Sequence, residues 1–122
     1  MDKHPSHRAS FDYPIDRYRV MNGTTVIADS TQVVLLNESS SKGRAQAVAY
    51  FPLADVNSQY LTPTDHHTVC PLKGQASYYT VTVGDRSLDN AAWYYPEPLS
   101  HVEEIRDCIA FYPDKLTIEI LR

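Results

Sequence analysis

The sequence QASYYTVTV, residues 75–83, contains the longest β-strand pattern in this chain. Successive side chains of a strand point to opposite faces, so Tyr79, Val81 and Val83 are expected on one face. The opposite face is expected to carry four other residues: Ala76, Tyr78, Thr80 and Thr82. Gly84–Asp85 follows as a turn. The chain is therefore expected to form a sheet strand here with side chains packed on two sides.

Short strand patterns recur on both sides of this segment. Alternation of polar and apolar residues at 17–21 predicts a strand. Asn22–Gly23 then predicts a hairpin turn, because both residues tolerate positive φ. Further strands are predicted for residues 24–28, 32–37, 46–51, 87–95, 108–112 and 116–121. The last two flank Pro113–Asp114, which is typical of a type I turn.

Helix signals are confined to two short stretches. Residues 53–63 have no clear period, which fits a single helical turn or an irregular connection. Ser100 followed by Glu103 matches a capping box and predicts a short helix through Ile105. Seven or eight short strands with frequent turns indicate an all-β fold, a small single domain of coiled antiparallel sheets. At most one or two short helical turns are expected in it.

Length and composition fit one small cytoplasmic domain. The 122 residues suffice for one core, and we expect a flexible tail at residues 1–12 and a single β domain at 13–122. The N-terminus has no apolar run, and no stretch approaches the roughly 18 apolar residues of a membrane span. Two cysteines are too few for a disulfide scaffold, so a reducing cytoplasm is predicted.

The charge argues against some classes of partner. Fifteen acidic and eleven basic residues give a formal charge of −4. Proteins that bind nucleic acid carry a basic stripe, and the basic residues here are scattered. Neither a nucleic acid nor a membrane is therefore predicted as a partner.

An ordered series of motifs spans residues 17 to about 121. Its core is Thr68-x-Cys70-Pro71-x-Lys73-Gly74-x-Ala76-x-Tyr78-Tyr79. Before it come residues 27–30, Glu38, residues 49–52 and Asp55–Val56; after it come residues 90–98 and 109–112. With these motifs the chain resembles the family catalogued as domain of unknown function 427.

This resemblance implies a stand-alone β domain of the β-tent type. Some catalogues attach a nucleotidyltransferase label to the family. The chain has neither a pair of acidic residues at Asp-x-Asp spacing nor a glycine-rich phosphate loop, so its residues give that label little support. It also has no Cys-x-x-Cys, the metal-binding knuckle of zinc-bearing β-tent proteins.

The Cys-Pro-x-Lys-Gly turn holds two candidate site residues. Cys70 is either a nucleophile or redox thiol, with a pKa lowered by Lys73, or a small buried residue at the start of a strand. Lys73 either presents its ammonium to an acidic or phosphate ligand or forms an ion pair with Glu38 or Asp55. The family pattern also has a lysine at this position.

Carboxylates and aromatic rings complete the predicted ligand-binding set. Glu38 and Asp55 are an acid/base pair if the fold brings them together, whereas Asp29 is expected to cap a turn. Four aromatic residues are candidate pocket walls: Tyr50, Tyr78, Trp93 and Tyr95. His66 and His67 would point to opposite faces of a strand, so no metal site is predicted. No cofactor is predicted.

Two classes of function remain open from the sequence. The first is an uncharacterised small-molecule-binding domain, with or without catalysis, whose pocket lies near the Cys-Pro-x-Lys-Gly turn. The alternative is a non-enzymatic protein-interaction module, as a monomer or a homodimer, that uses an exposed aromatic face or an edge strand. A nucleotidyltransferase, as the family label suggests, is a weaker alternative.

Overall fold

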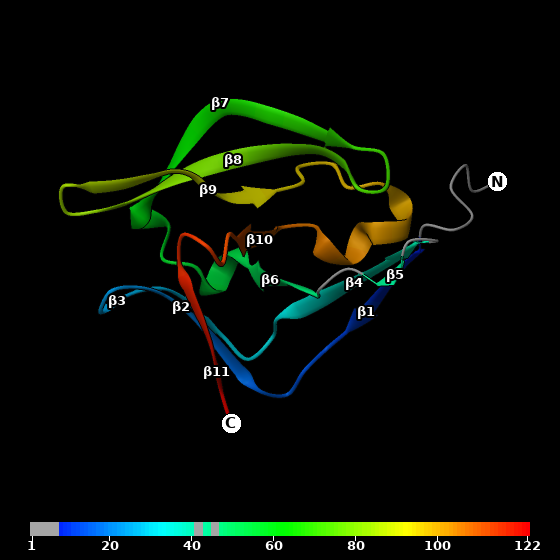
Figure 1. The fold of residues 1–122 in the computed structure, drawn as a ribbon, viewed down its shortest axis with the longest axis horizontal. Coiled ribbons are helices and arrows are strands. Elements are labelled where there is room, and N and C mark those ends of the chain that lie inside the picture. The colour runs from blue at the N-terminus through cyan, green and yellow to red at the C-terminus, as the bar shows by residue number, and fades with distance from the viewer. Residues whose placement is uncertain (1–7, 41–42, 45–46) are drawn as a thin grey trace.

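Figure 1 shows the protein as a computed structural model, which describes residues 8–40, 43–44 and 47–122. The longest strand pattern of the sequence is present as β8. The strands described are β1 (Arg8–Asp12), β2 (Arg17–Asn22), β3 (Thr25–Ser30), β4 (Val34–Ser40), β5 (Gly43–Arg44), β6 (Val48–Pro52), β7 (Leu61–Cys70), β8 (Gly74–Val83), β9 (Arg86–Tyr94), β10 (Cys108–Phe111) and β11 (Thr117–Leu121). The 3-10 helices described are η1 (Leu53–Asp55), η2 (Ser58–Tyr60) and η3 (Ser100–Ile105).

The strands form two antiparallel sheets. The larger sheet has the order β1-β4-β6-β10-β9-β8-β7, with the short β5 beside β4. The smaller sheet has the order β11-β2-β3. In Figure 1 the large sheet curls, so that β7, β8 and β9 lie on one side of the molecule and β1 and β4 on the other. The all-β prediction is confirmed.

The β8 strand separates two hydrophobic cores. Tyr79, Val81 and Val83 pack into a first core, which also contains β2, β3 and β11 residues. Ala76 and Tyr78 pack into a second core, which we call the interior cluster. Its buried members are Val34, Leu36, Tyr50, Ala76, Tyr78, Tyr95, Val102, Ile105, Cys108 and Ala110. For these five β8 residues the alternation predicts the correct face, whereas Thr80 and Thr82, predicted on the face of Ala76 and Tyr78, belong to neither core.

Tight turns join neighbouring strands where the sequence predicts them. Gly23 has a φ of 61° in the hairpin between β2 and β3, and Gly84 has a φ of 62° between β8 and β9. Glycine adopts this left-handed region without a steric penalty. The predicted hairpin at Asn22–Gly23 is confirmed.

The N-terminal prediction is wrong for residues 8–12. They form β1, which pairs with β4 so that Ala9 lies opposite Glu38 and Phe11 opposite Leu36. The physical reason is that Ala9 and Phe11 pack against the interior cluster. The rest of the predicted tail, residues 1–7, lies outside the described residues, as do residues 41–42 and 45–46; residue 46 is also the first residue of the strand predicted at 46–51.

The helical segments also differ in detail from the prediction. Residues 53–63 contain two 3-10 turns instead of one, so the described helical turns number three. The predicted capping box at Ser100 does not form: the N-cap of η3 is Leu99, with no side-chain cap hydrogen bond. Glu103 instead forms an ion pair with Arg106, which follows the helix.

Candidate ligand-binding site

The Cys-Pro-x-Lys-Gly turn joins β7 to β8 and is fixed against the segment that precedes η3. The Leu99 amide donates to the Lys73 carbonyl over 3.0 Å, and Nε2 of His101 donates to the Leu72 carbonyl over 2.5 Å. Gly74 has a φ of 116°, and a β-carbon there would lie 3.2 Å from the Glu97 carbonyl oxygen. Any other residue would be strained at this φ and would crowd the Glu97 carbonyl, so glycine is suited to this position.

Lys73 extends from this turn and forms an ion pair with Glu38 of β4. The two side chains are only 12% and 20% exposed. The Lys73 ammonium also lies 6.0 Å from the centre of the Tyr95 ring. Of the two carboxylates that the sequence offers as partners of Lys73, the structure brings Glu38 to it.

Asp55 lies elsewhere, on the η1 turn beside β3. Its carboxylate accepts a hydrogen bond of 2.6 Å from Ser30 Oγ, which in turn accepts one of 2.9 Å from the Gln32 amide. The fold thus places Glu38 with Lys73 and Asp55 with Ser30. Asp29 pairs with Arg17 and Arg19, and the hydrogen bond from Arg17 is the largest cause that lowers its pKa.

The predicted aromatic residues lie together in or against the interior cluster. Nε1 of Trp93 donates to the Tyr50 hydroxyl over 3.3 Å, and the two rings meet edge to face. Burial raises the pKa of the Tyr50 and Tyr95 hydroxyls above the ordinary tyrosine value, so both stay protonated at neutral pH. These hydroxyls are therefore suited to hydrogen bonding and unsuited to act as bases.

The two cysteines contact this cluster without a disulfide bond. Cys70 is half-buried and packs against the cluster, and Cys108 is a buried member of it. Burial raises the pKa of the Cys108 thiol to about 11. Cys108 is therefore a protonated, inert thiol at neutral pH.

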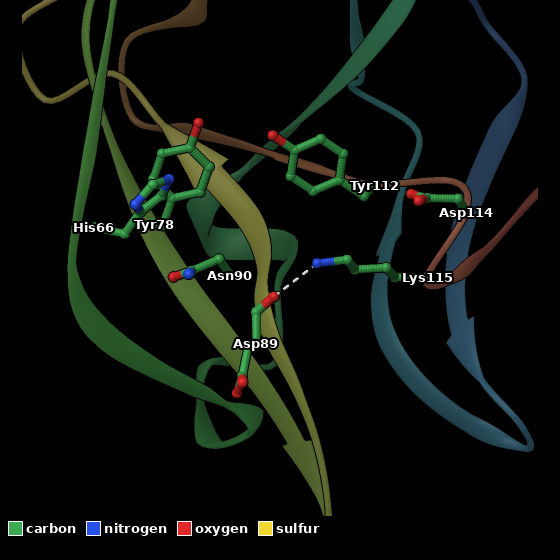
Figure 2. A pocket seen from close by; sticks show the side chains of 7 residues that line it. All are labelled: His66, Tyr78, Asp89, Asn90, Tyr112, Asp114 and Lys115. Carbon is green, nitrogen blue, oxygen red and sulfur yellow. Dashed lines mark hydrogen bonds between the residues drawn. The ribbon is translucent and has the colours of Figure 1, made fainter.

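An open hollow of about 420 Å³ lies between the β7–β9 part of the large sheet and the turn from β10 to β11 (Figure 2). Its lining consists of His66, Tyr78, Asp89, Asn90, Tyr112, Asp114 and Lys115. Tyr78 is the member that also belongs to the predicted ligand-binding set. None of the lining residues belongs to the Cys-Pro-x-Lys-Gly turn.

The wall formed by β7, β8 and β9 carries a ring pair and an amide. The His66 ring lies 4.5 Å from the Tyr78 ring. Asn90 has a φ of 50°, and its amide oxygen accepts a hydrogen bond of 2.8 Å from Thr64 Oγ1. The Asn90 backbone amide donates to Thr80 Oγ1 over 3.3 Å, where the pairing of β8 and β9 is irregular. Asparagine tolerates positive φ better than most residues, so it is suited to this bulge.

The opposite wall carries Tyr112 and Lys115. A hydrogen bond of 2.9 Å from the Tyr112 amide to the Ala91 carbonyl holds this turn against β9. The Lys115 side chain extends toward β9, and its Nζ donates a hydrogen bond of 2.8 Å to the Asp89 carbonyl (Figure 2). It lies 5.6 Å from the centre of the Tyr112 ring. Burial and hydrogen bonding with Tyr78 raise the pKa of Tyr112 to about 12, so its hydroxyl stays protonated at neutral pH.

The hollow and the interior cluster are connected through aromatic rings. The Tyr112 ring lies 4.5 Å from the Trp93 ring, and Trp93 donates to Tyr50. Tyr78 belongs to the cluster and lines the hollow, and its hydroxyl is 2.8 Å from Thr68 Oγ1. Of the predicted residues, Tyr78 lines the hollow, and Trp93 and Tyr50 lie behind its Tyr112 wall.

Sequence reasoning missed Asn90 and Lys115 as site residues. Asparagine is depleted in strands, so Asn90 within a strand pattern was a usable signal of a bulge. Lys115 follows the predicted turn at Pro113–Asp114, but no spacing in the sequence relates it to β9. The structure alone shows that contact.

Within the part of the chain that the structure describes, no group of three or more His, Cys, Asp or Glu residues could hold a metal ion. The described residues also contain no helix that is long and apolar enough to cross a membrane.

The fold and this site define an all-β domain with an aromatic, partly polar interior that opens into a surface hollow. The chain belongs to the family described as domain of unknown function (DUF427), whose model, labelled NTP_transf_9, matches residues 14–122. A search of curated proteins found no match.

Proposed function

We propose that this domain binds a small molecule in the hollow between β9 and the turn from β10 to β11. The observation that carries the proposal is the hollow itself. Its volume of about 420 Å³ falls in the range of roughly 300–1,000 Å³ usual for ligand sites. Its lining combines the rings of Tyr78, Tyr112 and His66 with four polar or charged residues, so it is more polar than most ligand sites.

In this proposal one predicted residue contacts the ligand, and the others support the site or hold the fold. Tyr78 contacts the ligand, and Trp93 and Tyr50 support the Tyr112 wall from the interior. The start of β8 is held in place by contacts of four other predicted residues: Lys73, Glu38, Tyr95 and Cys70. Asp55 holds the η1 turn to β3 through Ser30. The ion pair of Lys73 with Glu38 supports a structural role for this lysine.

A thermal-shift screen with a broad set of metabolites tests the proposal, because a ligand that binds the native state raises its stability by mass action. His66 and His67 provide a matched pair of variants on the same exposed strand. His66 lines the hollow, whereas Nδ1 of His67 lies 3.2 Å from Ser77 Oγ outside it. We expect at least one compound to raise the Tm of the wild type and of His67→Ala, and to raise that of His66→Ala less.

The proposal fails if no compound in the screen shifts the Tm. It also fails if every shift is the same in His66→Ala and in His67→Ala, because binding would then occur away from the hollow.

A protein-interaction module is the second candidate, and the observation that favours it is β7. This ten-residue strand is the last strand of the large sheet, and its Val69 is 77% exposed. Edge strands can pair with another chain. However, β7 contains Pro63 and an irregular register between Pro63 and His67, features that protect an edge against such pairing. A dimer in a sizing experiment that Val69→Lys disrupts would favour this candidate over ligand binding.

A nucleotidyltransferase activity is a third proposal, and its only support is the label of the family model. A thermal-shift measurement with nucleoside triphosphates and Mg²⁺ tests it, and the absence of a shift would count against it.

A further inference from the structure

Lys115 is the lysine that lines the hollow. An ammonium has three N–H donors. One is used on the Asp89 carbonyl, and the Tyr112 ring provides a second, weaker contact. No carboxylate of the described residues forms an ion pair with Lys115, in contrast to Lys73, which is paired with Glu38. Lys115 can therefore bind an anion without first losing a salt bridge.

Besides the carboxylates of Asp89 and Asp114, the lining of the hollow contains hydrogen-bond donors. The Asn90 amide oxygen is occupied by Thr64, whereas its nitrogen carries two N–H donors. The Tyr112 hydroxyl is protonated at neutral pH, and burial together with its hydrogen bond to Tyr78 raises its pKa to about 12. Asn90 and Lys115 lie on different sides of the hollow; in Figure 2 the Asn90 amide group points toward His66 and the Lys115 ammonium toward Asp89. A ligand that satisfies these donors must carry oxygen acceptors.

The remaining surface favours a flat apolar group. The Tyr78 ring, with His66 beside it, stands on one wall, and the Tyr112 ring stands on the other (Figure 2). Aromatic rings bind planar groups by offset stacking or edge-to-face contact. The volume of about 420 Å³ is at the small end of the usual range, which suits a ligand with one or two rings.

The acidic neighbours limit the charge of the anion. Asp89 and Asp114 line the same hollow as Lys115. The formal charge of the lining residues is therefore −1 when His66 is neutral. Each negative charge on the ligand is repelled by two carboxylates and attracted by one ammonium, so a dianion meets more net repulsion than a monoanion. A monoanion keeps the contact with Lys115 at a lower electrostatic cost.

From these four features, we infer that the ligand of the hollow is a small aromatic monocarboxylate, held by Lys115 and Asn90 between the Tyr78 and Tyr112 rings. This inference rests on the proposed function and specifies its ligand class. Lys115 and Asn90 are then the residues that determine specificity.

Four probes with one ring each test this ligand class: benzoate, benzyl alcohol, benzylamine and phenyl phosphate. They share the ring and differ in charge, from monoanion to neutral, cation and dianion. NMR titration of the full chain at neutral pH measures the dissociation constant of each, and millimolar values suffice. We expect benzoate to bind at least about fivefold more tightly than the other three.

Substitutions then test the residues. Lys115→Met keeps the length of the side chain and removes the charge, and we expect it to weaken benzoate binding about tenfold. Arg86→Met is the matched control, because Arg86 is an exposed cation of the β8–β9 hairpin that does not line the hollow. Asn90→Asp keeps a residue type that tolerates positive φ and replaces the donors by a carboxylate. We expect it to abolish benzoate binding and to improve that of benzylamine.

Each contrary outcome is informative. Tighter binding of benzylamine, benzyl alcohol or phenyl phosphate than of benzoate overturns the inferred class, as does benzoate binding that Lys115→Met leaves unchanged. If none of the four probes binds, the inference is overturned. The proposed function is judged separately, by whether any metabolite gives a shift that depends on His66.

Discussion

Lys73 belongs to the family motif, and its ion pair with Glu38 indicates a role in stabilising the fold. Removal of one partner from a buried pair leaves a poorly solvated charge, whereas removal of both can be close to neutral. The side chains are 12% and 20% exposed, so part of the charge still reaches water. The effect should therefore be smaller than the roughly 3–5 kcal/mol of a fully buried pair.

We predict that Lys73→Met lowers the free energy of unfolding by about 2 kcal/mol. The double variant Lys73→Met/Glu38→Gln should recover part of this loss, because it also removes the charge of Glu38. Urea denaturation of the wild type, both single variants and the double variant measures this coupling. Equal stability of Lys73→Met and the wild type would mean that the pair contributes nothing, and Lys73 would again be a candidate for ligand binding.

At the scale of elements, β1 closes the side of the sheet that β4 would otherwise expose. β1 pairs with β4 over five residues, and Ala9 and Phe11 pack against the interior cluster. Asn37 Nδ2 also donates to the Asp12 carboxylate over 2.9 Å. An uncovered strand edge lowers stability and offers a template for pairing between chains.

Two truncations separate the contribution of β1 from that of the preceding residues. A chain that begins at Tyr13 should have a Tm about 5–10 °C lower than a chain that begins at Arg8, on the basis of about 2 kcal/mol for the lost contacts. It should also form larger species in a sizing experiment at high concentration. Identical Tm values for the two truncations would show that β1 adds no stability.

The two cases β8 and β7 show what determines whether a strand can be predicted. Side chains of β8 pack into a different core on each face of the strand. The alternation of residues 75–83 between the two faces could therefore be recognised in the sequence. β7 is exposed along most of its length and carries polar residues on both faces, so no hydrophobic period marks it. β1 had a weak signal in Ala9 and Phe11, which the polar residues around it obscured.

The candidate site follows the same division. Lys73, Tyr78 and Trp93 lie in motifs that could be recognised, and the structure places them in or beside one cluster. The contact of Lys115 with Asp89 joins residues 26 positions apart and depends on how the β10–β11 turn docks on β9. Such long-range docking is set by tertiary packing, so local sequence patterns cannot supply it.

For the molecule as a whole, the interior cluster holds several protons that the unfolded chain would release at alkaline pH. An unperturbed cysteine ionises near pH 9.0, whereas burial raises the pKa of Cys108 to about 11. For Tyr112 the corresponding values are 10.0 and about 12. Burial raises the pKa of Tyr50 and Tyr95 in the same direction.

The protein should therefore lose stability as the pH rises above about 9. Between the unfolded and the folded pKa of each group, the folded state binds more protons, so the free energy of unfolding falls with increasing pH. This contribution is fully present below pH 9 and declines through pH 11 for Cys108 and through pH 12 for Tyr112. Urea denaturation in buffers at about pH 7.5, 9 and 10.5 measures how the free energy of unfolding changes with pH.

Cys108→Ala should be less stable than the wild type at neutral pH and should lose less stability between about pH 9 and 10.5, because the buried thiol no longer titrates. A free energy of unfolding that stays constant over this range in the wild type would show that the interior cluster does not hold these protons.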